Sequence, residues 1–395
     1  MCRVTNQGNT VMRNELNEIK SAAEPSTQQA ALPGQVVLVL QGGGALGSYQ
    51  AGVYEALHAA GIEPDWVIGT SIGAVNGAII AGNRPENRLV RLREFWSGAA
   101  RREPWPAVAP HAGAGNIFRN MWTVTYGLPG FFEPRFTAWF GPYTPLGAES
   151  ASYYSTAPLE GALAKLIDFP YLNDQHMRLS VATVGVRSGE MRYLSNRDTK
   201  LRMPHVMASA ALPPAFPAVR IDGEAYWDGG IHSNTPIEAI WDDHPRRDAV
   251  VFSVQLWPMS GPEPETVWQV LGRQKDIQYA SRTESQLKRQ RQIHRLRHII
   301  RELGRLMNED ARESPEVKKL LEWGCGTTMH VVQLKMPRFD GDDYAKDIDF
   351  SADGVQTRWD AGYRAARSVL EAAPWRHPVD PIEGIAVHEV AAPTE

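Results

Sequence analysis

Cysteine is scarce in this chain, which has only Cys2 and Cys325 among its 395 residues. Two cysteines are too few for a disulfide framework, so we expect free thiols and a reducing, cytoplasmic compartment. Long apolar runs are also missing. None approaches the roughly 18 residues that span a bilayer, so we expect any membrane contact to be peripheral. Residues 1–34 are polar and lack the apolar h-region of a secretory signal, and we interpret them as a flexible tail.

No sign of charge dominates the composition. The formal net charge is −4, which gives no global attraction to nucleic acid or to an anionic membrane. The most basic stretch, 282–305, carries eight Lys or Arg residues against two Glu, but no Phe, Tyr or Trp lies among them to stack on bases. We therefore expect no nucleic-acid partner. The apolar fraction of 43% is ordinary for a globular protein, and the length permits a substantial core.

Two strand–glycine–helix units lie within residues 35–82. The apolar runs 36–40 and 66–69 predict buried strands, and each ends in a glycine-rich turn. Helical periodicity follows each turn, over 45–59 and 72–82. This order predicts an α/β fold with a mainly parallel sheet, and it brings both glycine turns to the same edge of that sheet.

The second turn carries Ser71 in the pattern Gly69-Thr70-Ser71-Ile72-Gly73. A G-x-S-x-G sequence between a strand and a helix permits a sharp turn that exposes the serine hydroxyl at the helix N-terminus. The motif is common by chance, and its position after a buried strand is what makes Ser71 a candidate nucleophile.

The first turn, Gly42–Gly47, allows two interpretations. It fits the G-x-G-x-x-G pattern of dinucleotide-binding folds, which also need an acidic residue at the end of the second strand. Glu63 and Asp65 have the right spacing but precede that strand, so they would lie at the wrong end of the sheet. The alternative is an oxyanion hole, in which the N–H groups of Gly43 and Gly44 donate hydrogen bonds without side chains in the way.

A serine nucleophile needs a base, and Asp228 is the best candidate. It ends a predicted strand and precedes Gly229-Gly230, although an Asp-Gly pair is also common in ordinary turns. Ser71 lies too early in the chain for an α/β-hydrolase triad. Among the histidines, His232 is a rival base without an evident orienting partner, and His330 lies inside a predicted strand.

Together, GGGALG, GTSIG and ASAALPPAFPAVRIDGEAYWDGGIHSNTP resemble the patatin-like phospholipase family, in a bacterial-type form with a basic helical insertion. The resemblance implies a three-layer α/β/α sandwich and hydrolysis of lipid acyl esters through an acyl-enzyme, without a metal or cofactor. It implies that Ser71 is the nucleophile, Asp228 the base, and Gly43 and Gly44 the oxyanion donors. Leu46 departs from the family, which usually has Lys or Arg there. The remaining motif residues are Gly42, Gly47, Gly69, Gly73, Gly229 and Gly230.

We divide the chain into a tail, a catalytic core, an insertion, a closing segment and a second tail. The boundaries are 1–34, 35–257, 258–327, 328–376 and 377–395. Within the core, 101–155 is rich in Pro, Gly and aromatic residues. It is either a loop whose rings pack on the core or a cap that presents aromatic surface to lipid.

The insertion contains a helix whose apolar stripe includes Leu296, Ile300 and Leu303. This helix could pack by that stripe, bind anionic headgroups or bind a partner helix. Two alternatives to a lipid hydrolase remain at this point. One is a dinucleotide-binding oxidoreductase, and the other is a non-catalytic scaffold that binds lipid or protein. The favoured partner is a lipid or other acyl ester, with peripheral contact to a membrane or lipid droplet.

Overall fold

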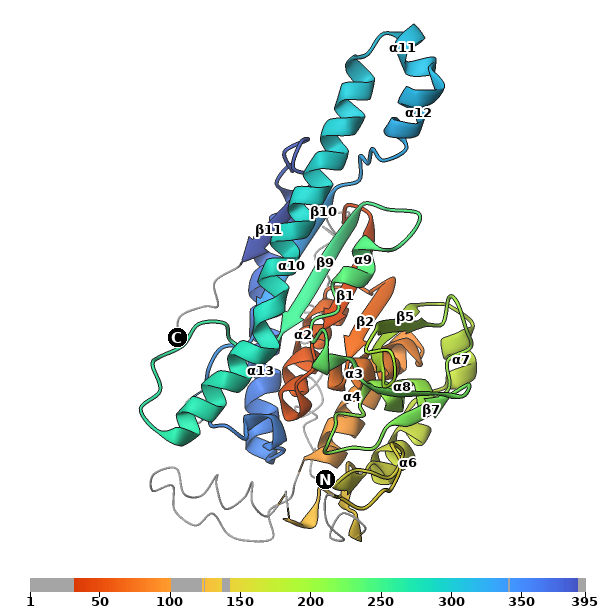
Figure 1. Ribbon diagram of the computed structural model, residues 1–395. Helices are drawn as coiled ribbons and strands as arrows, with labels where there is room; N and C mark the ends of the chain where they lie inside the picture. The colour runs from red at the N-terminus through yellow and green to blue at the C-terminus, as the bar shows by residue number, and fades with distance from the viewer. Residues whose placement is uncertain (1–31, 101–122, 124, 137–142, 340–341, 390–395) are drawn as a thin grey trace, which may run out of the picture. The chain divides into compact units, whose positions relative to one another are not determined.

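Apolar runs of Val, Leu and Ile form the central strands of the computed structural model (Figure 1), which describes residues 32–100, 123, 125–136, 143–339 and 342–389. The strands are β1 Gln35–Leu40, β2 Trp66–Thr70, β3 Glu133–Pro134, β4 Tyr154–Ser155, β5 Arg178–Gly185, β6 Met191–Ser195, β7 Val219–Ile221, β8 Glu224–Asp228, β9 Ala249–Gln255, β10 Met329–Lys335 and β11 Ile385–Glu389. Within these residues, nine strands form one sheet in the order β11-β10-β9-β1-β2-β5-β8-β7, with β6 also paired to β5. The pairs from β11 to β5 are parallel, whereas β6, β7 and β8 are antiparallel to their neighbours.

Helices connect the strands and cover the sheet. They are α2 Ser48–Ala59, α3 Ile72–Ala81, α4 Pro85–Ala99, α6 Ala157–Leu166, α7 Phe169–Asn173, α8 Met203–Ser209, α9 Glu238–Trp241, α10 Val267–Leu306, α11 Glu309–Glu313, α12 Pro315–Leu321 and α13 Ala352–Ala372. Short 3-10 turns are η1 Gly44–Gly47, η3 Gly229–Ile231, η4 Lys346–Ile348 and η5 Pro374–Arg376. The two expected strand–turn–helix units are confirmed, except that the first helix starts with the 3-10 turn η1.

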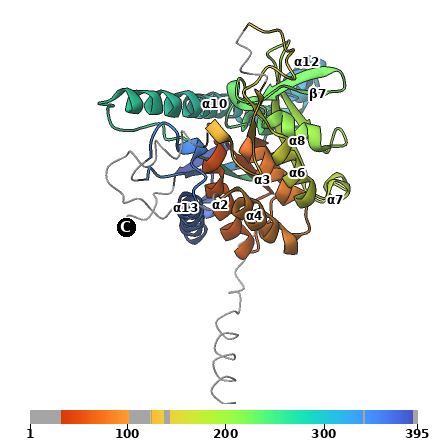
Figure 2. The ribbon, with the colours of Figure 1, turned by 90° about the horizontal axis from the view of Figure 1, so that it is seen from below.

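The two faces of the sheet bury different side chains, because successive residues of a strand point to opposite sides. Leu38 and Leu40 of β1 face a large cluster with α2, α3, α4 and α13. Val37 and Val39 face a second cluster with α9 and with Leu287 of α10. Figure 2 shows α10 on one side of the molecule and α2, α4 and α13 on the other. The expected three-layer α/β/α sandwich is confirmed.

Helix α10 packs by a different stripe from the one that the sequence suggests. Leu296 and Leu303 are 60% and 57% exposed, so the expected apolar stripe is wrong at these two positions, whereas Ile300 is half-buried. The buried side chains are also three, four or seven residues apart, but most of them are polar. They are Asp276, Ala280, Thr283, Leu287, His294 and His298. The helix lies partly over polar groups, and apolar periodicity alone cannot reveal such a face. The boundary between core and insertion remains a prediction, although Leu287 belongs to the second cluster of the sheet.

Residues 377–395 are not simply a tail. Strand β11 pairs in parallel with β10 from Met329 to Gln333, so Ile385–Glu389 of the expected tail belong to the sheet. Ile385 is buried at this edge of the sheet. The sequence signal was missed because the strand has only five residues and follows a polar stretch. Helix α13 begins after Ser351, whose hydroxyl accepts a hydrogen bond from the N–H of Gly354 at 3.1 Å.

Helices α2 and α13 cross at very short range through two glycines. A Cβ atom on Gly52 would overlap the main-chain oxygen of Trp359, and one on Gly362 would overlap that of Tyr49. Glycine at both positions lets the two backbones touch. This crossing joins the first unit of the fold to the last long helix. Within the described ranges, no helix is both long enough and apolar enough to cross a membrane.

We predict that Gly362→Ala lowers the free energy of unfolding by about 1–3 kcal/mol, because the added methyl group forces the two helices apart. The matched control is Gly161→Ala on α6, where an added Cβ meets nothing within 4 Å. That change should leave stability equal or raise it by up to ~1 kcal/mol, through its higher helix propensity. Urea unfolding followed by circular dichroism measures both. Equal stability of the two variants would contradict the close crossing.

Candidate active site

The strand register brings Ser71 and Asp228 to the same level of the sheet. Thr70, the last residue of β2, pairs with Ala182 of β5, and Asp228, the last residue of β8, pairs with the adjacent Thr183. Ser71 follows Thr70 directly and therefore lies beside the end of β8. The structure thus brings together two predicted site residues that are separated by more than 150 positions in the chain.

The glycine loop after β1 joins them. A Cβ atom on Gly42 would lie 3.2 Å from the Cβ of Ser71 and would overlap the Asn234 side chain. The main-chain N–H of Gly42 donates to the main-chain oxygen of Asn234 at 3.1 Å. The side-chain Nδ2 of Asn234 donates back to the main-chain oxygen of Gly42 at 3.0 Å. Three loops, after β1, β2 and β8, therefore meet with almost no side chain between them.

Ser71 has an unusual backbone conformation, with φ 55° and ψ −124°. Non-glycine residues seldom have positive φ, and such strain is concentrated at functional sites. The flanking glycines make the turn possible, because a Cβ on Gly69 would overlap Gly73 and one on Gly73 would overlap the Leu40 oxygen. The N–H of Ser71 donates to Ser209 Oγ at 3.0 Å, which in turn donates to the Ala182 oxygen at 2.7 Å. Ser209 of α8 and Ala182 of β5 therefore hold the turn in place.

Gly43 and Gly44 directly follow Gly42, on which an added Cβ would lie 3.2 Å from the Cβ of Ser71. Among the hydrogen bonds of the described residues, none uses the N–H of Gly43 or Gly44 as its donor. Gly44 has φ +56°, and a Cβ there would overlap the main-chain oxygen of Asp347. The Gly42 oxygen accepts a hydrogen bond from Trp257 Nε1 at 2.7 Å, which fixes the loop on its other side. Leu46 is fully buried, so its side chain packs in the core.

Asp228 is 1% exposed, and burial raises its pKa from 3.8 to about 7. Removing a carboxylate from water favours its neutral form. The Ser71 hydroxyl and the Gly230 N–H lower the pKa by hydrogen bonding, but burial outweighs them. Oδ1 accepts the Gly230 N–H at 2.7 Å. Oδ2 is buried and accepts no hydrogen bond of standard geometry within the described part of the chain. A buried carboxyl group beside the Ser71 hydroxyl, with a pKa near neutrality, is suited to accept a proton.

The rival histidines lie elsewhere. His232 follows the turn after Asp228 but is exposed to solvent. His330 is near the amino end of β10, where its Nδ1 lies 3.0 Å from Nε2 of His388 on β11. The structure therefore brings neither histidine between Ser71 and a carboxylate.

Sequence reasoning missed the residues that support these loops. They are Gln41, Ser209, Asn234, Thr235, Trp257 and Tyr279. Gln41 is 1% exposed, and its side chain donates to Thr235 Oγ1 at 2.7 Å and accepts the Trp257 N–H at 3.1 Å. Asn234 could have been noticed because it closely follows Asp228. No local pattern distinguishes Ser209 or Tyr279, which reach the site only through the fold.

The aromatic segment 101–155 is described only in part. Phe131 is buried against Phe95 and Phe350, and Phe132 against Tyr154. These rings support the interpretation of a loop packed on the core. Tyr143, by contrast, is 96% exposed. The positions 101–122, 124 and 137–142, which include several of the segment's aromatic residues, lie outside the described residues.

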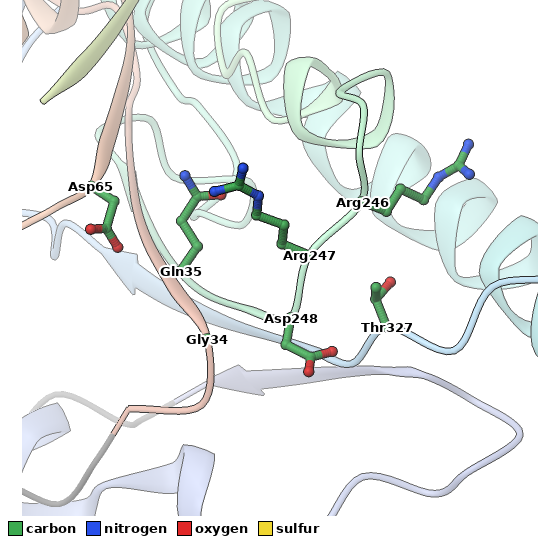
Figure 3. Close-up of a pocket in the computed structure, with 7 residues that line it drawn as sticks. All are labelled: Gly34, Gln35, Asp65, Arg246, Arg247, Asp248 and Thr327. Atoms are coloured by element: carbon green, nitrogen blue, oxygen red, sulfur yellow. The ribbon is translucent and has the colours of Figure 1, made fainter. Parts of the chain in front are cut away.

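A surface pocket lies at the opposite edge of the sheet (Figure 3). Its lining residues are Gly34, Gln35, Asp65, Arg246, Arg247, Asp248 and Thr327. Four of these residues lie just before the amino ends of strands, namely Gly34, Asp65, Asp248 and Thr327. Gly42 and Ser71, by contrast, follow the carboxyl ends of β1 and β2. Asp65 and Asp248 already accept main-chain N–H groups at 2.8 and 2.7 Å, and the side chains of Arg246 and Arg247 point in different directions (Figure 3). This pocket is separate from the candidate site.

Two family models match the chain. One is described as patatin-like phospholipase and covers residues 38–241, slightly more than half of the chain, and one described as patatin phospholipase covers 277–382. Patatin-like phospholipase domain-containing protein 6 of Mus musculus is 44% identical over 62 residues, which are 16% of this chain and 5% of that protein. Lysophospholipase nte1 of Aspergillus terreus is 61% identical over 46 residues, 12% and 3% respectively. The chain therefore matches only a small part of each relative.

A third relative, triacylglycerol lipase ptl3 of Schizosaccharomyces pombe, is 35% identical over 65 residues, 16% of this chain and 14% of that protein. Among solved structures, VipD from Legionella pneumophila aligns over 88% of this chain and 69% of its own, with 14% identity and a TM-score of 0.37.

We predict that Asp228→Asn stabilises the protein more at pH 8 than at pH 4. The folded-state pKa of Asp228 is raised to about 7. Stability from the protonated carboxyl is therefore complete below the ordinary pKa near 4 and is lost as the pH rises through about 7. Asparagine cannot ionise and avoids this loss. Thermal unfolding of the wild type and of Asp228→Asn between pH 4 and pH 8 measures the difference in Tm at each pH. The control is Asp198→Asn, because the Asp198 side chain is 61% exposed. A difference in Tm that does not change with pH would contradict the raised pKa.

Proposed function

The chain belongs to the patatin-like phospholipase family, and we propose that it is a serine hydrolase of lipid acyl esters that uses a Ser71–Asp228 dyad. The observation that carries the proposal is the meeting of the strained Ser71 turn, the buried Asp228 carboxylate and the Gly43–Gly44 amides at one edge of the sheet. Family membership supports the reaction class, and the geometry supports the roles of the individual residues.

Ser71 acts as the nucleophile. Its hydroxyl attacks the carbonyl carbon of the ester, and Asp228 accepts the hydroxyl proton as the new C–O bond forms. A carboxylate of ordinary pKa would hold this proton weakly at neutral pH, whereas a pKa of about 7 matches the base to the working pH. A histidine between the two is unnecessary, because Ser71 lies close enough to lower the pKa of Asp228.

The N–H groups of Gly43 and Gly44 stabilise the oxyanion of the tetrahedral intermediate. Both are without hydrogen-bond acceptors among the described residues, and Trp257, Asn234 and η4 hold their loop in place. Donors that are fixed before the reaction need no reorganisation when the charge develops. Removal of one such donor typically costs about 10²–10³ in rate.

Asp228 then returns the proton to the leaving alcohol oxygen, and the C–O bond to the alcohol breaks. This leaves the acyl group on Ser71. In the second half of the reaction, Asp228 takes a proton from water, which attacks the acyl carbon, and the proton passes to Ser71 Oγ as the fatty acid departs. The two halves use the same groups in reverse roles.

We also propose peripheral contact with a membrane or lipid-droplet surface. Exposed aromatic and aliphatic side chains support this, including Tyr143 at 96%, Val267 at 75% and Trp268 at 54%. The basic stretch of α10 supports it less, because Arg291 and Arg295 both lie within 3.4 Å of Glu383. A cytoplasmic location remains a prediction.

Ser71→Ala and Asp228→Asn are each expected to lower kcat/KM for p-nitrophenyl butyrate to below about one thousandth of the wild-type value. His232→Ala, a change at the exposed rival base, should retain at least half of it. Esterase assays with circular dichroism of each variant provide the measurement. A fluorophosphonate probe with peptide mapping should label Ser71 in the wild type and leave Ser71→Ala unlabelled. Full activity of Asp228→Asn would remove the dyad.

The pH dependence of kcat/KM should follow a single ionisation. The base must be ionised, so activity is expected to rise with pH through a midpoint at about 7 and to fall about tenfold per unit well below it. Discontinuous assay of released butyrate from pH 4.5 to 9, with stability checked at each pH, measures the profile. A midpoint near 4 would show that burial does not raise the pKa of the base.

A further inference from the structure

Gln41 connects the glycine loop to several other segments of the fold. It follows β1, directly precedes Gly42 and is almost fully buried. Its main-chain N–H donates to the Val254 oxygen at 3.3 Å, and its main-chain oxygen accepts a hydrogen bond from Gln50 Nε2 at 2.6 Å. These two bonds hold the main chain just before the glycines. Because a glycine has no side chain that could hold its own orientation, the position of the loop depends on such neighbours.

The side-chain oxygen of Gln41 holds the glycine loop a second time, through the residues that follow β9. Oε1 accepts the main-chain N–H groups of Leu256 and Trp257, the latter at 3.1 Å. The side chains of these two residues flank the loop, because a Cβ atom on Gly43 would lie 2.9 Å from Leu256 Cδ1 and 3.3 Å from Trp257 Nε1. Gln41 therefore fixes both the main chain that leads into the loop and the residues that pack on it.

The side-chain nitrogen of Gln41 joins the loop to helix α10. Nε2 donates to Thr235 Oγ1 at 2.7 Å and to the main-chain oxygen of Tyr279 at 3.3 Å. Thr235 Oγ1 also accepts a hydrogen bond from the Thr283 hydroxyl at 2.8 Å. Tyr279 and Thr283 are four residues apart on α10, so both lie on the same face of the helix. Thr283, Thr235 and Gln41 are all buried and form one hydrogen-bonded series from α10 to the loop.

We propose that Gln41 is a positioning residue for the N–H groups of Gly43 and Gly44. Thr283 of α10 acts on the same N–H groups through Thr235 and Gln41. Oxyanion donors stabilise the transition state most when they are fixed before the charge develops, and a fully paired buried network supplies that rigidity. Helix α10 then contributes to the rate without contacting the substrate. This inference rests on the proposed function and adds to it a group of residues on which the rate depends.

The first test replaces the amide of Gln41 with an apolar side chain of similar length. Gln41→Met should lower kcat for p-nitrophenyl butyrate by about 10- to 100-fold and change KM by less than about twofold, because the donors act mainly in the transition state. An alkyl trifluoromethyl ketone forms an adduct with Ser71 that carries an oxyanion. Its Ki should rise by the same factor as kcat falls.

The matched control is Asn196→Leu. Asn196 is also a buried amide, and it hydrogen-bonds the main chain of Leu172, Met177 and Leu179 near the amino end of β5, away from the proposed site. Its replacement should lower the free energy of unfolding but leave kcat within about twofold of the wild-type value.

Thr283 provides a milder test with a conservative pair of variants. Thr283→Val has a similar shape but lacks the hydroxyl, and it should lower kcat by about three- to tenfold. Thr283→Ser keeps the hydroxyl and should retain at least about half of the wild-type kcat. In the Gln41→Met background, Thr283→Val should cause no further loss, since both changes act on one network.

A folded Gln41→Met protein with a kcat within about twofold of the wild-type value would overturn the inference. Equal losses in Thr283→Val and Thr283→Ser, or losses that add fully in the double variant, would also overturn it, because Thr283 would then act by packing alone. If Gln41→Met does not fold, the comparison of the two Thr283 variants decides. In all these cases, wild-type hydrolysis and labelling of Ser71 still support the proposed function. A wild-type protein that neither hydrolyses the ester nor is labelled at Ser71 would overturn both.

Discussion

Burial of the Asp228 carboxylate is the constraint on which the rest of the site depends. Among the residues that the structure describes, no cationic side chain is paired with this carboxyl, so burial disfavours its ionised form and raises its pKa to about 7. The carboxylate is kept dry by its position at the end of β8, against β5 and under the turn that carries Ser71. A Lys or Arg next to Asp228 would stabilise its ionised form and thereby the fold. It would also lower the pKa of Asp228 and make it a weaker base. The fold thus retains an unfavourable charge where the proposed chemistry requires one.

The sequence was sufficient to predict the parts of the site that depend on local backbone geometry. Strands β1 and β2 follow from their apolar runs, and Gly69 and Gly73 from the sharp turn around Ser71. Asp228 was predicted as the base because it combines a strand end with two glycines, and the structure does place it at the end of β8. These signals are local, since a turn that needs glycine leaves its mark within a few residues of the chain.

The remaining features depend on contacts between distant segments. Ser209 accepts a hydrogen bond from Ser71, which lies more than 130 residues earlier in the chain. Tyr279 accepts one from Gln41, which lies more than 200 residues earlier. Neither has a neighbouring pattern that reveals its partner. Strand β11 is short, and only its pairing with β10 defines it. The face of α10 was wrongly predicted for the same reason, because its buried histidines contact main-chain oxygens at Thr327 and Pro381 instead of apolar side chains.

The glycine crossing of α2 and α13 has a consequence for the order of folding during synthesis. The ribosome releases α2 and Ser71 early, but the helix that covers α2 begins only at Ala352. Until then the side of α2 that carries Gly52 lacks its partner α13, and contacts at such long sequence separation form slowly. Nascent chains of this protein therefore pass through a stage in which the proposed nucleophile has been synthesised but α2 still lacks its contact with α13. Chaperone protection is most valuable at that stage.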